Sequence, residues 1–157
     1  YACLQISKAL GCRVIATTHK ESKLSLIADA DEAVLDDGKL TGRLSGVTKA
    51  LDLVGPRSLT DTLTAVEKGG IICQTGLLGG VYVLNGFDPI KDIPNGVYLT
   101  GFFSNYPTQQ VMDSIFSFIG EKGLVPGYAR VFDFDRIRDA AAAQDEGLAN
   151  GKIVVRL

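Results

Sequence analysis

The residues of this chain best suited to bind a ligand lie in one stretch, a short apolar run followed by hydroxyl and basic side chains. Val14-Ile15-Ala16-Thr17-Thr18 has the composition of a buried strand, and the polar run His19-Lys20-Glu21-Ser22-Lys23 follows it directly. Where an α/β unit binds a dinucleotide, a carboxylate near the end of such a strand hydrogen-bonds the free 2′-hydroxyl of the adenosine ribose. A neutral or basic site accepts a 2′-phosphate instead. The order of residues therefore favours NADPH over NADH.

Three side chains of this run are candidates for contact with such a phosphate. Lys23 offers a compact positive charge at the start of a predicted helix, Thr18 avoids the repulsion of a carboxylate, and Ser22 adds a hydrogen-bond donor. The alternative for Lys23 is a solvated lysine on a helix face. His19 is the only histidine, so we expect no histidine-based catalytic pair and no catalytic residue within the chain.

Two glycine turns are further candidates for ligand contact. Gly55 and the turn Thr75-Gly76-Leu77 each follow a predicted strand. Open parallel sheets bind ligands at the carboxyl ends of their strands, and glycine lets the backbone approach the ligand closely. The alternative is that both are tight strand-to-helix turns without a ligand.

Other polar and glycine-rich features favour no chemistry. Asp36 and Asp37 are neighbours on a strand end, where side chains point to opposite faces, and we interpret them as a solvated turn. Gly79-Gly80 lacks the spacing of a phosphate loop. The three cysteines are far apart and form no C-x-x-C pair. They indicate free thiols in a reducing, cytoplasmic compartment and no metal site.

The surrounding pattern predicts the elements that position these residues. Helices are expected over residues 1–10, 21–28, 59–68, 109–121 and 134–144, with Gly11 as a C-cap and Asp135 as an N-cap. Strands are expected over residues 13–17, 33–35, 48–54, 71–74, 97–103 and 153–157, and residues 81–95 are expected to form an irregular connection. Apolar strands alternating with short helices predict an α/β fold with a parallel sheet covered on both faces.

Composition limits the class of protein. The chain has 157 residues, 46% of them hydrophobic, and a net charge of −2. It is long enough for one domain with its own core, and its charge gives no reason to expect nucleic acid as a partner. No run approaches the roughly 20 apolar residues that span a membrane, so we expect no membrane partner.

Four segments in order resemble the cofactor domain of the medium-chain dehydrogenase/reductase superfamily. They are Gly11-Cys12-Arg13-Val14-Ile15-Ala16-Thr17-Thr18 with Lys23-Leu24, Ala50-Leu51-Asp52-Leu53-Val54-Gly55 with Leu59 and Leu63, residues 68–76, and residues 151–157. Within that superfamily the chain looks most like the quinone-oxidoreductase branch, whose members are zinc-free and use NADPH. The resemblance implies a doubly wound, mostly parallel, Rossmann-like sheet.

The resemblance also implies that residues 1–157 are a partial dinucleotide-binding domain. In such proteins the first strand, the glycine-rich phosphate loop and an N-terminal catalytic domain all precede the position of Tyr1. Since the only methionine is Met112, we expect the chain to be part of a longer protein and to be inactive alone. Relatives place backbone groups of Thr100-Gly101-Phe102-Phe103-Ser104 beside the nicotinamide ring. The alternative is an ordinary strand with Phe102 or Phe103 in the core.

The function implied for the parent protein is hydride transfer from NADPH to a quinone or another activated carbonyl or alkene. The nicotinamide performs that chemistry, so the absence of a recognisable nucleophile does not argue against it. The cofactor-binding candidates are Thr18, Ser22, Lys23, Gly55, Thr75, Gly76, Leu77, Phe102 and Phe103. The alternatives are a zinc-dependent alcohol dehydrogenase and a non-catalytic nucleotide-binding or interaction module.

A homodimer is expected as well. The uncharged run from Val97 to Ser104 invites strand pairing if it lies at a sheet edge, and some relatives pair there across a two-fold axis. Replacing Thr100 with Pro is predicted to delete a backbone donor and weaken that dimer. The alternative is an internal strand with no role in assembly.

Overall fold

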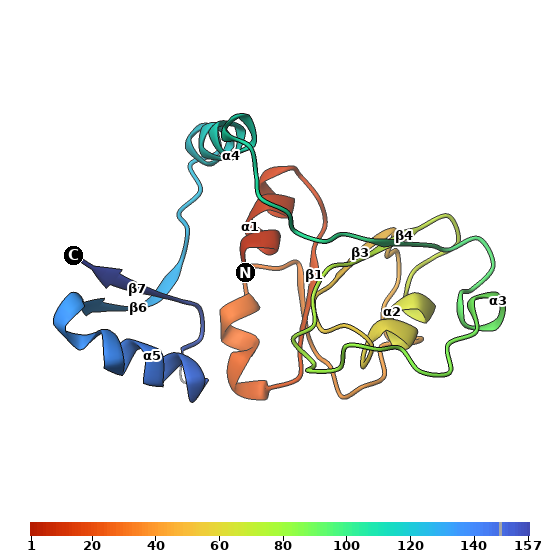
Figure 1. Ribbon diagram of the computed structural model, residues 1–157. Coiled ribbons are helices and arrows are strands. Elements are labelled where there is room, and N and C mark those ends of the chain that lie inside the picture. Colours follow the sequence, from red (N-terminus) through yellow and green to blue (C-terminus); the bar gives the residue numbers. More distant parts are fainter. Residues whose placement is uncertain (148) are drawn as a thin grey trace. The chain divides into compact units, whose positions relative to one another are not determined.

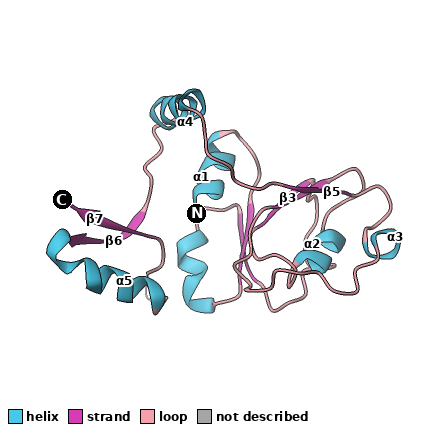
Figure 2. Cartoon of the chain, viewed as in Figure 1, coloured by secondary structure: helices cyan, strands magenta, loops and turns pink. Residues whose placement is uncertain are grey.

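The computed structural model describes residues 1–147 and 149–157 (Figure 1). The chain forms two compact units, each combining helices with short strands (Figure 2). Unit 1 consists of Tyr1–Ala16, Ser25–Ala33 and Thr108–Leu157, and unit 2 consists of Thr17–Leu24 and Val34–Pro107. Within the described residues, no helix has the length and apolar character needed to cross a bilayer.

Unit 2 is built around a three-stranded parallel sheet. Its strands β3 (Lys49–Asp52), β4 (Ile71–Gln74) and β5 (Tyr98–Gly101) pair in chain order. Parallel neighbours need crossover connections. Helix α2 (Leu59–Ala65) connects β3 to β4, and a segment with the short helix α3 (Pro89–Asp92) connects β4 to β5.

The core of unit 2 lies between α2 and the sheet. Leu59, Leu63 and Val66 recur at helical spacing and therefore share one face. All three are buried and cluster with Ile72 and Val97, and the side chains of Leu63 and Ile72 are fully enclosed. This packing fixes α2 on the sheet, and with it the turns that leave the carboxyl ends of the strands.

Unit 1 contains a further crossover connection. Strand β6 (Tyr128–Asp133) pairs in parallel with β7 (Lys152–Arg156). They are connected by the 3-10 turn η2 (Phe134–Arg136) and helix α5 (Ile137–Asp145). The face of α5 that carries Ala140 and Ala143 is buried, since small side chains allow close packing of the helix on the two strands.

Two more helices of unit 1 have ends that follow from local sequence. Helix α1 (Ala2–Ala9) is followed by Gly11 at φ +78°, the left-handed conformation that a C-terminal glycine adopts without strain, as predicted. Helix α4 (Gln109–Glu121) follows Thr108, whose Oγ1 accepts a hydrogen bond from Val111 N. This bond satisfies one of the free donors of the first turn.

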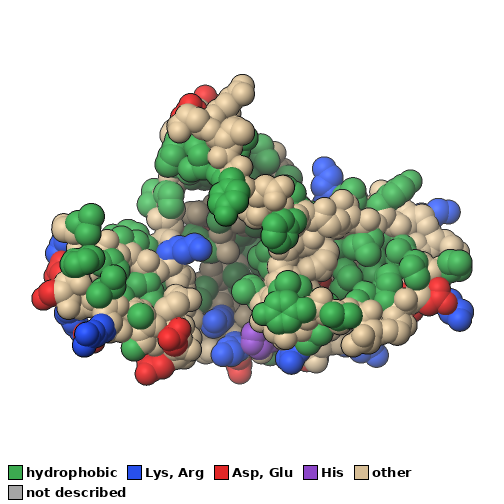
Figure 3. All heavy atoms as spheres, in the orientation of Figure 1, with side chains coloured by type: hydrophobic (Ala, Val, Ile, Leu, Met, Phe, Trp, Pro, Cys, Tyr) green, Lys and Arg blue, Asp and Glu red, His purple; other side chains and the backbone are tan. Residues whose placement is uncertain are grey.

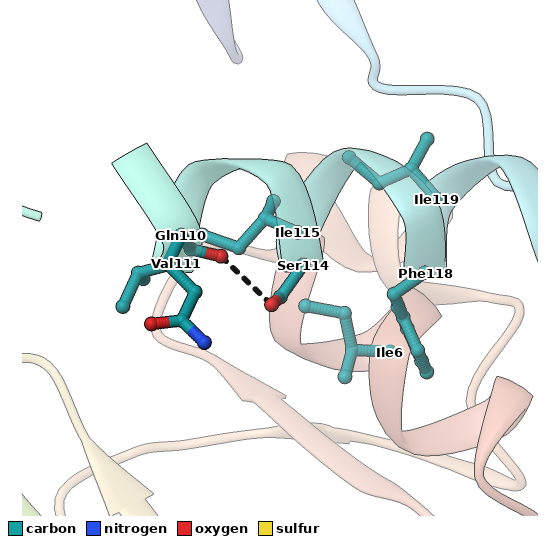
Figure 4. Close-up of a pocket in the computed structure, with 7 residues that line it drawn as sticks. All are labelled: Ile6, Gln110, Val111, Ser114, Ile115, Phe118 and Ile119. Atoms are coloured by element: carbon teal, nitrogen blue, oxygen red, sulfur yellow. Dashed lines mark hydrogen bonds between the residues drawn. The ribbon is translucent and has the colours of Figure 1, made fainter. Parts of the chain in front are cut away.

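An apolar cavity of about 430 Å³ is lined by residues of α1 and α4 (Figure 4). Its wall contains Ile6, Val111, Ile115, Phe118 and Ile119. The hydroxyl of Ser114, also in the wall, donates to Gln110 O of its own helix at 2.8 Å. No lining side chain is ionisable, so the cavity offers none of the groups that acid–base chemistry needs.

Strands β1 (Ile15–Thr18) and β2 (Glu32–Leu35) form a separate two-stranded sheet. Glu32 N donates to Val14 O at 3.2 Å and Asp36 N donates to Thr18 O at 2.8 Å. The partners advance together along the chain, so the two strands are parallel. The predicted α/β class with parallel strands is confirmed, but the strands fall into three sheets instead of one.

Two predictions of helical structure need correction. The stretch predicted as a helix over residues 21–28 is the 3-10 helix η1 (Glu21–Ile27), in which Lys23 N bonds Lys20 O three residues back. The connection over residues 81–95 contains α3, because Asp88 Oδ1 accepts from Ile90 N and Pro89 needs no donor at the first position.

Two predictions near the C-terminus also need correction. Strand β6 is absent from the predicted elements, because it is exposed at every position except Phe132 and so lacks a buried apolar run. Asp135 does not cap a helix but lies inside η2, which Asp133 precedes.

Candidate cofactor-binding site

The carboxyl ends of β3 and β4 bring the two predicted glycine turns into contact. Gly55 has φ +95°, and a Cβ there would lie 2.9 Å from Gly76 O. A Cβ at Gly76 would collide with the backbone of Leu53. Both positions therefore require glycine, for conformation at Gly55 and for space at Gly76. We call the backbone of residues 53–55 and 75–79 the glycine cradle.

Hydrogen bonds continue the pairing of β3 and β4 into the glycine cradle. Thr75 N donates to Asp52 O at 3.0 Å, Leu78 N to Leu53 O at 3.0 Å, and Gly79 N to Val54 O at 2.8 Å. The two turns thus form one connected surface at the carboxyl edge of the sheet, where open α/β sheets bind their ligands.

The end of β5 is attached to the same surface. Phe102 N donates to Gln74 O at 3.0 Å, and Thr75 Oγ1 donates to Phe102 O at 2.7 Å. The side chains of Phe102 and Phe103 are 62% and 84% exposed. The alternative that places either ring in the core is therefore wrong. Leu77, 44% exposed, also turns part of its side chain to solvent.

Sequence reasoning missed the residue that organises the first turn. Asp52 is 4% exposed, and its Oδ1 accepts from Val54 N at 2.9 Å and Gly55 N at 2.8 Å. Its Oδ2 accepts from Ser58 Oγ at 2.9 Å and Thr62 Oγ1 at 3.1 Å. The available signal was an acidic residue ending an apolar strand, followed by hydroxyl residues on the next helix.

Gln74 plays a similar part in the second turn. Its Nε2 donates to Gly76 O at 2.6 Å. Its Oε1 is buried and has no hydrogen-bond partner among the described residues. A buried acceptor without a donor is unusual in a folded protein. The carboxyl edge of the sheet thus holds one unused acceptor next to a backbone surface that excludes side chains, which fits a bound ligand carrying N–H or O–H groups.

The remaining candidates form a second group at the end of β1. Thr18 Oγ1 accepts from Lys20 N at 3.3 Å, and Lys23 is half-buried at the start of η1 while Ser22 is exposed. Within the described part of the chain, no acidic group pairs with the ammonium of Lys23. No hydrogen bond among these residues connects this group to the glycine cradle.

The described residues offer no cluster of metal ligands. Residues 1–147 and 149–157 contain no group of three or more His, Cys, Asp or Glu side chains that could hold an ion. The three cysteines are free, and Cys3 and Cys12 are exposed. The described residues therefore do not fit a zinc site, and no zinc-assisted step follows from them.

One carboxylate outside the site has a shifted pKa. Lys8 Nζ lies 2.7 Å from Asp31 Oδ1, and Val14 N donates to Asp31 Oδ2 at 2.7 Å. The hydrogen bond from the lysine, followed by that from the backbone, lowers the pKa of Asp31 from its ordinary value of 3.8. Its contacts join α1 to the start of β1.

Comparison with known proteins gives the family. The family model described as a zinc-binding dehydrogenase matches residues 28–155, and the chain belongs to that family. The alcohol dehydrogenase of Geobacillus stearothermophilus is 24% identical over the whole chain and 47% of its own length. The acryloyl-coenzyme A reductase of Sulfurisphaera tokodaii is 29% identical over 57% of the chain and 29% of its own length. The chain thus spans at most about half of these relatives.

Solved structures agree on the fold. A structure described as an NAD-dependent alcohol dehydrogenase has 25% identity and a TM-score of 0.80, over 99% of this chain and 47% of that chain. E. coli K-12 YhdH with bound NADPH has 20% identity and a TM-score of 0.69, over 97% and 49%. The chain therefore has the Rossmann-like fold of dehydrogenase cofactor domains.

Proposed function

We propose that this chain is the cofactor-binding part of an NADPH-dependent oxidoreductase that transfers a hydride to a quinone or another activated carbonyl or alkene. The single observation that carries the proposal is the glycine cradle. Gly55 and Gly76 leave no room for side chains at the carboxyl edge of a parallel sheet, the place where this fold binds nucleotides. Membership of the dehydrogenase family supports the same assignment.

The residues of the chain bind and orient the cofactor. When bound, the nicotinamide supplies the hydride, and the protein supplies position and electrostatics. Gly55 and Gly76 let the ligand approach the backbone, and the Thr75 hydroxyl holds the end of β5 beside them. Gln74 Oε1 offers its free acceptor to an N–H or O–H group of the ligand. The exposed ring of Phe102 forms an apolar wall next to the glycine cradle.

The preference for NADPH rests on the end of β1. The strand ends in Thr18 rather than a carboxylate, and Lys23 is available for a 2′-phosphate. The fold itself does not decide between cofactors, because one similar structure is called NAD-dependent and another contains NADPH. Titrating the full-length protein with both dinucleotides tests the assignment. Tighter binding of NADPH supports it, and binding of neither contradicts the function as a whole.

The substrate is proposed as a small molecule with an activated double bond. Acryloyl-coenzyme A, named for one relative, carries a conjugated alkene. A zinc-dependent alcohol dehydrogenase is the second candidate, favoured by the name of the other relative. Two assays of the full-length protein distinguish these candidates. The first measures NADPH oxidation with a benzoquinone and with an α,β-unsaturated thioester. The second measures alcohol oxidation before and after metal chelation. A nucleotide-binding module without catalytic activity would convert neither the quinone, nor the thioester, nor the alcohol.

The separation of β1 and β2 from the sheet of β3, β4 and β5 supports the proposal that the chain is a partial cofactor domain. In the common doubly wound order 3-2-1-4-5-6, the first strand lies between the second and the fourth. We assign β1 and β2 to positions two and three, and β3, β4 and β5 to positions four to six. The position that would join them is then the first strand, which with its phosphate loop and a catalytic domain belongs to the rest of the parent protein. The free thiols fit a cytoplasmic location.

A further inference from the structure

The carboxylate of Asp52 is buried and hydrogen-bonded at both oxygens. It accepts from two backbone N–H groups and two hydroxyls, while no basic side chain contacts it among the described residues. A buried acidic group is costly unless its oxygens are fully hydrogen-bonded. An apolar residue would suit this buried position at lower cost, so the carboxylate points to a requirement of the turn that follows.

The bonds of Asp52 define the shape of that turn. Oδ1 draws the N–H groups of Val54 and Gly55 inward, toward the strand. Oδ2 is bound by Thr62 Oγ1 on α2, a helix held against the sheet by Leu59 and Leu63. The carboxylate therefore connects a turn, which is left-handed at Gly55, to a helix whose apolar face is packed in the core.

Gln74 does the same for the neighbouring turn. Asp52 and Gln74 are register partners on adjacent parallel strands, so their side chains lie on the same face of the sheet. Asp52 holds Gly55 through its N–H, and Gln74 holds Gly76 through its carbonyl. A Cβ at Gly55 would lie 2.9 Å from Gly76 O, and a Cβ at Gly76 would collide with the backbone of Leu53, so neither position tolerates a side chain.

We propose that Asp52 is a positioning residue, which sets the backbone geometry of the glycine cradle by holding the β3 turn against the β4 turn. It acts on the cofactor only through Gly55 and Gly76. The proposal rests on the proposed function, because it assumes that a dinucleotide binds at the cradle. It assigns to Asp52 the selective control of cofactor affinity, beyond its contribution to stability.

Three variants of the full-length protein test the proposal. Asp52→Leu removes the acceptor of Val54 N and Gly55 N. Asp52→Asn keeps one oxygen for these two donors and presents an amide to Ser58 and Thr62, whose hydroxyls can accept as well as donate. Thr62→Val removes one bond of the same carboxylate and leaves the turn alone. NADPH and NADH affinities are measured by fluorescence titration, and thermal midpoints by circular dichroism.

We expect Asp52→Leu to weaken binding of both dinucleotides at least tenfold, and Asp52→Asn to restore affinity to within about threefold of the parent. Thr62→Val is expected to lower the thermal midpoint and leave affinity unchanged. If Asp52→Leu does not fold, Asp52→Ser replaces it, since the smaller side chain leaves room for water at the two donors.

The outcomes separate the two proposals. Parent protein that binds neither dinucleotide contradicts the proposed function. Parent protein that binds, together with an Asp52→Leu or Asp52→Ser variant of unchanged affinity, overturns the positioning role. A third outcome also overturns the positioning role. If affinity falls in the Asp52 variants and in Thr62→Val alike, in proportion to the loss of thermal midpoint, Asp52 is a purely structural residue.

Discussion

Lys23 is the single side chain on which the cofactor preference depends most. It is half-buried at the start of η1 and has no ion pair among the described residues. We predict that Lys23→Ala weakens NADPH binding by about 1–3 kcal/mol, the scale of a charged hydrogen bond left unmade. NADH, which lacks the 2′-phosphate, should bind almost as before. Fluorescence titration of the full-length protein measures both.

The control for this prediction is Lys49→Ala. Lys49 is exposed at the amino end of β3, the opposite end of the strand from the cradle, and its removal changes net charge by the same amount. It should leave both affinities unchanged. Equal losses of NADPH and NADH affinity in Lys23→Ala would show that the lysine does not contact the 2′-phosphate.

Gly76 tests the cradle itself. A Cβ there would collide with Leu53, whereas a Cβ at Gly101, at the end of β5, would meet nothing nearer than Gln74 O at 4.0 Å. We predict that Gly76→Ala costs about 1–3 kcal/mol of stability, as overpacking does, and weakens dinucleotide binding. Gly101→Ala should stay within about 0.5 kcal/mol. Urea unfolding and titration of both variants measure this, and similar behaviour of the two would contradict a tight contact at Gly76.

The sequence alone pointed to the glycines of the cradle but not to Asp52, which holds the first turn in place. Gly55 and Gly76 were recognisable because Gly55 directly follows one predicted strand and Gly76 lies in the turn after the next, which is local information. Asp52 was not, because its partners Ser58 and Thr62 become neighbours only when α2 folds back over β3. Its other partners are backbone N–H groups, which no side-chain pattern reveals.

At the scale of elements, Asp31 joins α1 to β1 through a pH-sensitive contact. Because its pKa is lower in the folded protein, its contribution to stability is present above 3.8 and is lost as the pH falls toward the folded pKa. We predict that Asp31→Asn is less stable than the parent at neutral pH, and that the difference shrinks in acid. The effect is small, since the group is exposed. Urea unfolding at several pH values measures it.

Asp145→Asn is the matched control for that series. Asp145 is an exposed carboxylate at the end of α5 in the same unit, with no hydrogen bond or ion pair given to its side chain by the described residues. Since Asp145 makes no contact like that of Asp31 with Lys8 and Val14, Asp145→Asn should unfold at about the same urea concentration as the parent protein. A stability difference for Asp31→Asn that stays constant from neutral to acidic pH would contradict the contact.

Elements with a buried face were predictable, and those without one were not. α2 and β4 each present buried apolar residues, such as Leu63 and Ile72, and their sequence pattern shows it. β6 is exposed nearly throughout and pairs with β7, which lies about twenty residues further along the chain. η1 differs from an α-helix only in backbone geometry, which side-chain periodicity over seven residues does not resolve.

At the scale of the whole molecule, the edge of β5 is the proposed dimer interface. β5 is the outer strand of its sheet, and no strand among the described residues pairs with its other side. Tyr98 N donates to Gly70 O and Phe102 N donates to Gln74 O. Since strand backbones alternate with a period of two, the N–H of Thr100 also faces β4. The prediction that Thr100→Pro removes an edge donor is therefore wrong, because that change breaks the ladder to β4 instead.

By the same alternation, Leu99 and Gly101 carry the N–H donors of β5 that face the open edge. We predict that the full-length protein is a homodimer at micromolar concentration and that Gly101→Pro makes it monomeric, because Pro removes an outward N–H and is tolerated on edge strands. The thermal midpoint of the Gly101→Pro subunit should change little, whereas Thr100→Pro should lower it by disrupting β4–β5 pairing. Light scattering after size-exclusion chromatography gives the masses. A monomeric parent protein, or a Gly101→Pro variant that dimerises as strongly as the parent, would exclude pairing through this edge.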